Sequence, residues 1–138
     1  MGNGLSGYGQ DVSRPTLVLK PAGVSSWKEV ASGGSGTTCA LDQHKAAWCW
    51  GRGQYGTIGD GSTIDRLSPT AVTTPSTISY WLHLSLGTNV ACGLGKPLGT
   101  TSDVEGLAFC WGGCRRVTAE AHALREGRDV GAARDDGG

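Results

Sequence analysis

The sequence predicts an all-β fold made of repeated units of short antiparallel strands. The run Trp48-Cys49-Trp50 favours the pleated surface of a buried strand, and five glycines between residues 51 and 61 end that strand in a tight loop. The same strand-and-loop pattern returns further along the chain, with Trp111-Gly112 in the place of Trp50-Gly51. Repeats near fifty residues with short strands are typical of a propeller or a similar array.

The spacing of equivalent residues supports the repeat. Trp27 and Trp81 lie 54 residues apart. Further pairs keep the same order: Gly33 and Gly87 at 54, Cys39-Ala40-Leu41 and Cys92-Gly93-Leu94 at 53, and 47–51 and 108–112 at 61. The increase from 53 to 61 places an eight-residue insertion in 95–106, which is rich in Gly, Thr and Ser. Insertions belong in loops, so the strand register is expected to survive this one.

The first unit is expected to contain four strands, at 27–32, 37–41, 46–50 and, after Pro69, 70–72. The polar residues 42–45 are expected to form the hairpin loop between the second and third strands, and 95–107 the corresponding loop of the second unit. Tryptophans that recur at fixed phase are expected in the core of each unit: Trp27, Trp50, Trp81 and Trp111.

Four of the five cysteines form pairs that are symmetric about a hairpin loop, namely Cys39 with Cys49 and Cys92 with Cys110. Opposed positions on antiparallel neighbours bring the backbones within the range that a disulfide accepts. Free thiols that fill a buried core would account for the same spacing, and both interpretations stay open. Cys114 is left over, and Cys110-x-x-x-Cys114 has no second pair to complete a zinc site.

The order of these features resembles the repeat of the regulator of chromosome condensation family. The matching positions are Trp27, Ala31, Gly33, Gly34, Thr38-Cys39-Ala40-Leu41, Cys49-Trp50-Gly51, Tyr55-Gly56, Gly59-Asp60-Gly61-Ser62-Thr63, Arg66, Pro69 and Val72. The resemblance implies a partial β-propeller, with about two four-stranded antiparallel blades of a ring that normally has seven.

The chain is divided accordingly into four parts. Residues 1–24 form a degenerate partial repeat, 25–72 a complete repeat, 73–112 a divergent repeat and 113–138 a charged tail. The tail contains no aromatic residue, and it is expected to be disordered or to form a short helix over 119–126.

The resemblance implies a protein-interaction scaffold. Individual members of the family promote nucleotide exchange on a small GTPase, bind chromatin, inhibit a β-lactamase or form a receptor ectodomain in plants. The hairpin loops differ in length and chemistry between the two units, so they are the candidate partner-binding loops. Their candidate residues are Asp42, Gln43, His44, Lys45, Lys96, Asp103 and Glu105. Two alternatives are a regulator of nucleotide exchange and a non-functional fragment of a longer propeller protein.

Charge and hydropathy argue against several other classes of protein. The chain carries 12 basic and 12 acidic side chains, so it lacks the electrostatic footprint of a nucleic-acid or anionic-membrane binder. No run approaches the roughly twenty apolar residues of a transmembrane helix, and no apolar stretch follows Met1 as in a signal peptide. An extracellular location is considered only if the cysteine pairs are disulfides.

An enzyme is the rival class. Asp60, Asp65 and Arg66 lie close together, as paired carboxylates of a hydrolase do. The structural interpretation is preferred, because Asp60 between two glycines suits a turn that its own side chain stabilises, while Arg66 braces the neighbouring blade. Gly51-x-Gly53-x-x-Gly56 matches the dinucleotide fingerprint, but no helix follows to hold a pyrophosphate. No catalytic residue, cofactor or metal is therefore predicted.

Overall fold

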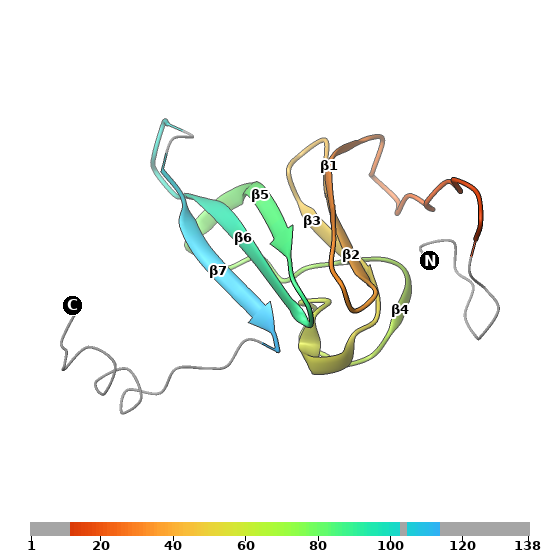
Figure 1. The fold of residues 1–138 in the computed structure, drawn as a ribbon. Helices are drawn as coiled ribbons and strands as arrows, with labels where there is room; N and C mark the ends of the chain where they lie inside the picture. The colour runs from red at the N-terminus through yellow and green to blue at the C-terminus, as the bar shows by residue number, and fades with distance from the viewer. Residues whose placement is uncertain (1–11, 103–104, 114–138) are drawn as a thin grey trace, which may run out of the picture.

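The computed structural model describes residues 12–102 and 105–113, and this part of the chain is all-β, as the sequence predicts (Figure 1). The first blade is an antiparallel sheet of four strands in sequence order: β1 (Trp27–Ser32), β2 (Thr37–Asp42), β3 (Ala47–Gly51) and β4 (Arg66–Ala71). A 3-10 turn, η1 (Gln54–Gly56), lies between β3 and β4. The second blade has three described strands: β5 (Ile78–Leu86), β6 (Val90–Pro97) and β7 (Leu107–Gly112).

The first three strands lie within one residue of their predicted bounds, but the fourth does not. β4 begins at Arg66 instead of residue 70, and Pro69 lies inside it. Proline is tolerated here because β4 is the edge strand of its sheet and because the ladder with β3 is irregular between Cys49 and Gly51.

The second hairpin loop is shorter than predicted, since β6 continues to Pro97 and the loop runs from 98 to 106. Gly95 suggested a loop, yet it pairs with Leu107 inside the sheet. A Cβ at Gly95 would lie 2.7 Å from Cγ2 of Ile78. The glycine is therefore required by close packing against β5 and does not mark a turn.

The core lies between the two blades. One side of the first blade, which we call its back, is almost completely buried at Cys39, Leu41, Ala47 and Cys49. It packs against the front of the second blade, which consists of Trp81, Leu84, Phe109 and Trp111. The packing is thus back to front, and the two contacting surfaces are different.

Contacts between the blades join residues one repeat apart. Ser35 Oγ accepts a hydrogen bond of 3.1 Å from the backbone N–H of Asn89, 54 residues later. At Gly33 a side chain would meet the carbonyl oxygen of Gly87, again 54 residues away, at 2.5 Å. The close approach of β1 and β5 therefore depends on a glycine at this point of the repeat.

The four tryptophans form two equivalent pairs, but they are not equally buried. Trp27 lies 6.0 Å from Trp50 between ring centroids, and Trp81 lies 5.5 Å from Trp111. Trp50 and Trp81 are 3% and 1% exposed, as expected for the core. Trp27 and Trp111 are half-buried, because they belong to strands at the edges of the described sheets.

Candidate interaction rim

The two hairpin loops lie at the same end of the adjacent blades, at the upper side of Figure 1, and η1 lies at the opposite end. They join β2 to β3 through residues 43–46 and β6 to β7 through residues 98–106. We call these two loops, together with Tyr80 and Lys96 beside them, the hairpin rim. The rim contains most of the residues that the sequence offered as partner-binding candidates.

Asp42 is an exception, because its carboxylate is buried and holds the first hairpin together. The residue is only 3% exposed. Its Oδ1 accepts hydrogen bonds from the backbone N–H groups of His44 (2.8 Å) and Ala46 (3.0 Å), and its Oδ2 accepts one from Trp48 Nε1 (2.9 Å). The structure therefore corrects the assignment of Asp42 to a partner-binding surface, since its side chain satisfies internal donors.

Gln43 also has a structural contact, with the segment that precedes β1. Its Nε2 donates to the carbonyl of Gly23 (2.7 Å), and its Oε1 accepts from the backbone N–H of Ser25 (3.1 Å). This segment contains a turn in which Val24 N donates to the Pro21 carbonyl.

That turn recurs before β5, where the backbone N–H of Ile78 donates to the carbonyl of Pro75 at 3.3 Å. The spacing of the two turns is again 54 residues, since Pro21 and Val24 occupy the equivalent positions. Sequence reasoning missed this element, although the paired prolines were a visible signal. The repeat therefore extends upstream of the first blade's strands.

Lys45, Tyr80 and Lys96 bring the two blades together at the rim. The ammonium groups of Lys45 and Lys96 lie 5.0 Å and 5.4 Å from the centroid of the Tyr80 ring, within the range of cation–π attraction. The backbone N–H of Trp81 also donates to the Lys45 carbonyl at 3.0 Å. The arrangement places two positive charges around one aromatic ring, with contributions from both blades.

The remaining candidates are at the outer parts of the loops. His44 and Glu105 are exposed. Asp103 lies outside the described residues, as do Cys114 and the helix expected over 119–126. Among the described candidates, the structure thus brings Lys45 and Lys96 together and leaves His44 and Glu105 facing solvent.

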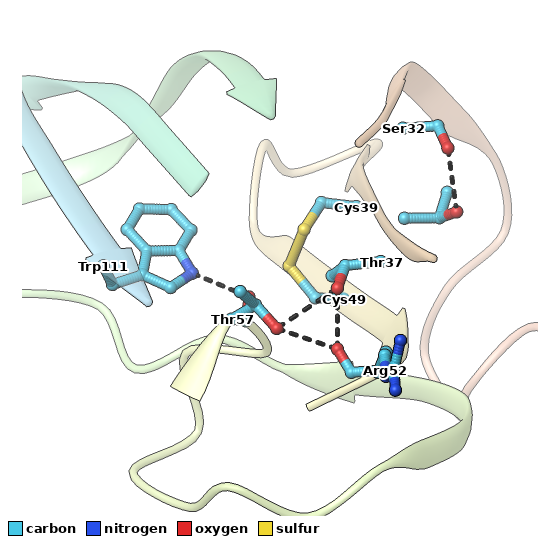
Figure 2. The surroundings of a disulfide bond; sticks show 8 residues. Ser32, Thr37, Cys39, Cys49, Arg52, Thr57 and Trp111 are labelled. Atoms are coloured by element: carbon cyan, nitrogen blue, oxygen red, sulfur yellow. Dashed lines mark hydrogen bonds between the residues drawn. A yellow bond between two sulfur atoms is a disulfide. The ribbon is translucent and has the colours of Figure 1, made fainter. Parts of the chain in front are cut away.

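Disulfides join Cys39 to Cys49 and Cys92 to Cys110, which are directly opposed in their strand pairs. Figure 2 shows the surroundings of the first bridge, where a polar network links the blades. The buried hydroxyls of Thr37 and Thr57 donate to the Arg52 carbonyl at 2.6 and 2.8 Å. Trp111 Nε1 on the second blade donates to the Thr57 carbonyl at 3.1 Å. Thr57 and Trp111 are again 54 residues apart, so this network belongs to the repeated interface.

The carboxylates of the glycine-rich loop stabilise backbone turns. Asp60 accepts hydrogen bonds from the N–H and hydroxyl of Ser62 and from Arg66 Nε, the last at 2.7 Å. Burial acts to raise the pKa of Asp60, but these hydrogen bonds and the Arg66 charge hold that pKa below its ordinary value of 3.8. Asp65 Oδ1 accepts from the backbone N–H of Gly53. Arg66 therefore braces its own loop, which corrects the expectation that it braces the neighbouring blade.

Two searches of the described part of the chain concern metals and membranes. Residues 12–102 and 105–113 hold no group of three or more His, Cys, Asp or Glu side chains placed to bind a metal ion. In the same residues, no helix has the length and apolar character needed to cross a bilayer.

Comparison with known families gives the sequence its relatives. The regulator of chromosome condensation (RCC1) repeat matches residues 46–95, and a second form of the same repeat matches residues 27–57. The chain belongs to the RCC1 repeat family. No curated protein matches the sequence.

Solved structures with RCC1 architecture match as well. Prp20p from Saccharomyces cerevisiae, a protein that binds Gsp1p and histones, is 27% identical over 63% of this chain, with a TM-score of 0.51. Human WBSCR16 is 23% identical over 51% of this chain, with a TM-score of 0.46. The chain covers 19% and 17% of these two proteins, which is about a fifth of their length. The two sheets are therefore blades of an RCC1-type β-propeller.

The RCC1 match at 46–95 is out of phase with the blades. It begins beside β3 of the first blade and ends within β6 of the second. One sequence repeat thus contributes strands to two neighbouring blades, and the connection between β4 and β5 passes through the interface. The buried Val72 belongs to this connection, and its N–H donates to the Ala47 carbonyl at 3.0 Å.

Proposed function

We propose that this RCC1-repeat chain is a protein-interaction scaffold whose partner surface is the hairpin rim. The observation that carries the proposal is the convergence of Lys45 and Lys96 on Tyr80, from two blades, at the end of the molecule where both loops project. Prp20p, which binds Gsp1p and histones, supports a protein as the partner.

The rim has the properties that a binding surface requires. Aromatic side chains are enriched at protein interfaces, and a positive cluster favours a partner with acidic side chains through complementary potentials. The loop at 98–106 carries the insertion that distinguishes the second repeat from the first, and its ends are closed by the pairing of Gly95 with Leu107. The loop can therefore change without disturbing the sheet below it.

A charge reversal with a matched control tests the proposal. Lys96→Glu alters the rim, whereas Lys28→Glu makes the same change at an exposed position on β1. Affinity capture with the wild-type chain is expected to recover a partner that Lys28→Glu retains and Lys96→Glu loses, with equal melting temperatures for all three proteins. Loss of the partner with both variants, or with neither, contradicts the assignment of the rim.

A second variant separates the loop from the charge cluster. Replacing residues 98–106 by a short Gly-Ser turn is expected to preserve the fold and abolish the same interaction. A photo-reactive residue at His44 is expected to cross-link to the captured partner, whereas the same residue at Lys28 is not. Cross-linking from Lys28 alone would place the partner elsewhere on the molecule.

The alternative, regulation of nucleotide exchange on a small GTPase, follows from the family resemblance alone. An exchange assay distinguishes it from a scaffold. Release of labelled guanine nucleotide from the captured partner, accelerated by the wild-type chain, would establish the exchange function. Stable binding with an unchanged release rate supports the scaffold.

A further inference from the structure

The back of the second blade repeats a surface that is buried elsewhere in the same molecule. It consists of Cys92, Leu94, Ala108 and Cys110, which are equivalent by register and spacing to the four residues of the first blade's back. Leu41 of the first blade is 2% exposed beneath the second blade, whereas its equivalent Leu94 is 39% exposed. Ala108 and Cys110 are exposed as well. The same kind of surface is thus covered in one blade and open in the next.

The front of the first blade is open in a complementary way. Its residues Trp27, Val30 and Trp48 are equivalent to Trp81, Leu84 and Phe109, which cover the back of the first blade. Val30 is 64% exposed, whereas Leu84 is 8% exposed. The chain therefore presents one unused front and one unused back, the two surfaces that pack together at its own interface.

The unused back also has the shape of an acceptor. A hollow of about 170 Å³ lies on it, between β5, β6 and the start of β7. Its lining is almost entirely apolar and includes Leu84, Leu94 and Ala108. Cavities of about 150 Å³ accept a benzene ring, so this hollow has room for a large aliphatic or aromatic side chain.

The polar groups at the centre of the interface also fit a second copy. In the internal interface Glu29 Oε2 accepts from the backbone N–H of Leu84 (2.7 Å), and Oε1 lies 3.1 Å from His83 Nδ1. His83 is the equivalent of Glu29 in the second blade, and it is 72% exposed at its side chain. A first blade placed on the second blade's back would bring Glu29 of the second copy toward His83. The acid–imidazole pairing is therefore retained when the two positions exchange roles.

We propose that the front of the first blade in one copy of this chain docks on the back of the second blade in another copy. The contact repeats the internal blade interface, with Val30 seated in the hollow beside Leu94. Because the two surfaces differ, the association is heterologous and continues from copy to copy, until it closes into a ring or forms an open chain. This self-association is independent of the hairpin rim, since the rim lies at the loop ends and the docking surfaces lie on the sheet faces.

Single substitutions on each surface test the proposal on the full 138-residue chain, with free thiols alkylated to prevent intermolecular disulfides. Val30→Lys blocks the front, Leu94→Lys blocks the back, and Leu98→Lys is the control at an apolar loop residue that is 60% exposed. Light scattering after size exclusion is expected to show concentration-dependent oligomers for the wild type and the control. Both interface variants are expected to remain monomeric, with unchanged circular dichroism.

Mixing the two interface variants identifies the geometry. The Val30→Lys chain retains its back and the Leu94→Lys chain retains its front, so an equimolar mixture is expected to form a dimer and nothing larger. A wild-type chain that stays monomeric across micromolar to millimolar concentrations would overturn the proposal. Association that appears only after residues 114–138 are deleted would also overturn it, because the tail would then be the occupant of the open back.

Discussion

The buried carboxylate of Asp42 is expected to be one of the largest polar contributions to the stability of the first blade. Asp42→Ala leaves three donors without their acceptor: the N–H groups of His44 and Ala46 and the indole of Trp48. Hydrogen bonds to a charged group contribute about 1.5–3 kcal/mol each, but water reaches the exposed His44 and replaces part of the loss. We therefore expect unfolding free energy to fall by about 2–4 kcal/mol.

Urea denaturation monitored by tryptophan fluorescence measures this loss. With an m-value of about 1–2 kcal/mol/M, the midpoint of Asp42→Ala is expected to fall by about 1–3 M. Asp42→Asn keeps an acceptor and should lose less, whereas Glu105→Ala, the exposed control, should stay within about 0.5 kcal/mol of the wild type. An Asp42→Ala midpoint equal to that of the control would refute the proposed role of the carboxylate.

Three further predictions concern other parts of the fold. The folded-state pKa of Asp60 lies below 3.8, so its ionised form stabilises the protein above that pH, and the contribution is lost as the pH falls through the folded-state pKa. Asp60→Asn should therefore reduce the acid dependence of the melting temperature below about pH 4. Gly53→Ala places a Cβ against the carbonyl of Ile64, which is backbone and cannot rotate away, so thermal unfolding should show a loss of about 2–3 kcal/mol. Non-reducing peptide mapping of chain made in an oxidising compartment should recover Cys39–Cys49 and Cys92–Cys110, and replacing either pair by serine should cost about 3 kcal/mol, whereas a Cys39–Cys92 bridge would contradict the hairpin register.

The repeat spacing was enough to predict the fold class and the hairpin pairing. Residues placed symmetrically about a turn face each other in an antiparallel pair, which is why Cys39 and Cys49 are directly opposed in the structure. The eight-residue insertion left the register of the second hairpin intact, since β6 and β7 pair continuously from Val90 to Gly95. Local pattern therefore determined most of the strands.

The same pattern did not predict the roles of single residues. Asp42 looked like a solvent-facing loop residue, because a polar side chain at a turn gives no sign of the three donors that converge on it. Gly95 looked like a turn residue, although Ile78 on another strand excludes a side chain there. Both roles depend on atoms that tertiary structure brings together.

The candidate site was predicted only as two separate loops. Nothing in the sequence placed Lys45 and Lys96 around Tyr80, because that contact requires knowing which ends of neighbouring blades coincide. The back-to-front packing of the blades was likewise not contained in the repeat period. The period identifies equivalent residues, and the direction of packing determines which of them meet.

The central claim is that two RCC1 blades pack back to front with contacts one repeat apart. Nuclear Overhauser measurements on isotopically labelled chain test it most directly. The structure predicts cross-peaks from the Trp111 indole N–H to Thr57 and between the α-protons of Gly33 and Gly87, all at a separation of 54 residues. Cross-strand peaks within each hairpin, without any peak at this separation, would show that the blades form but do not pack as described.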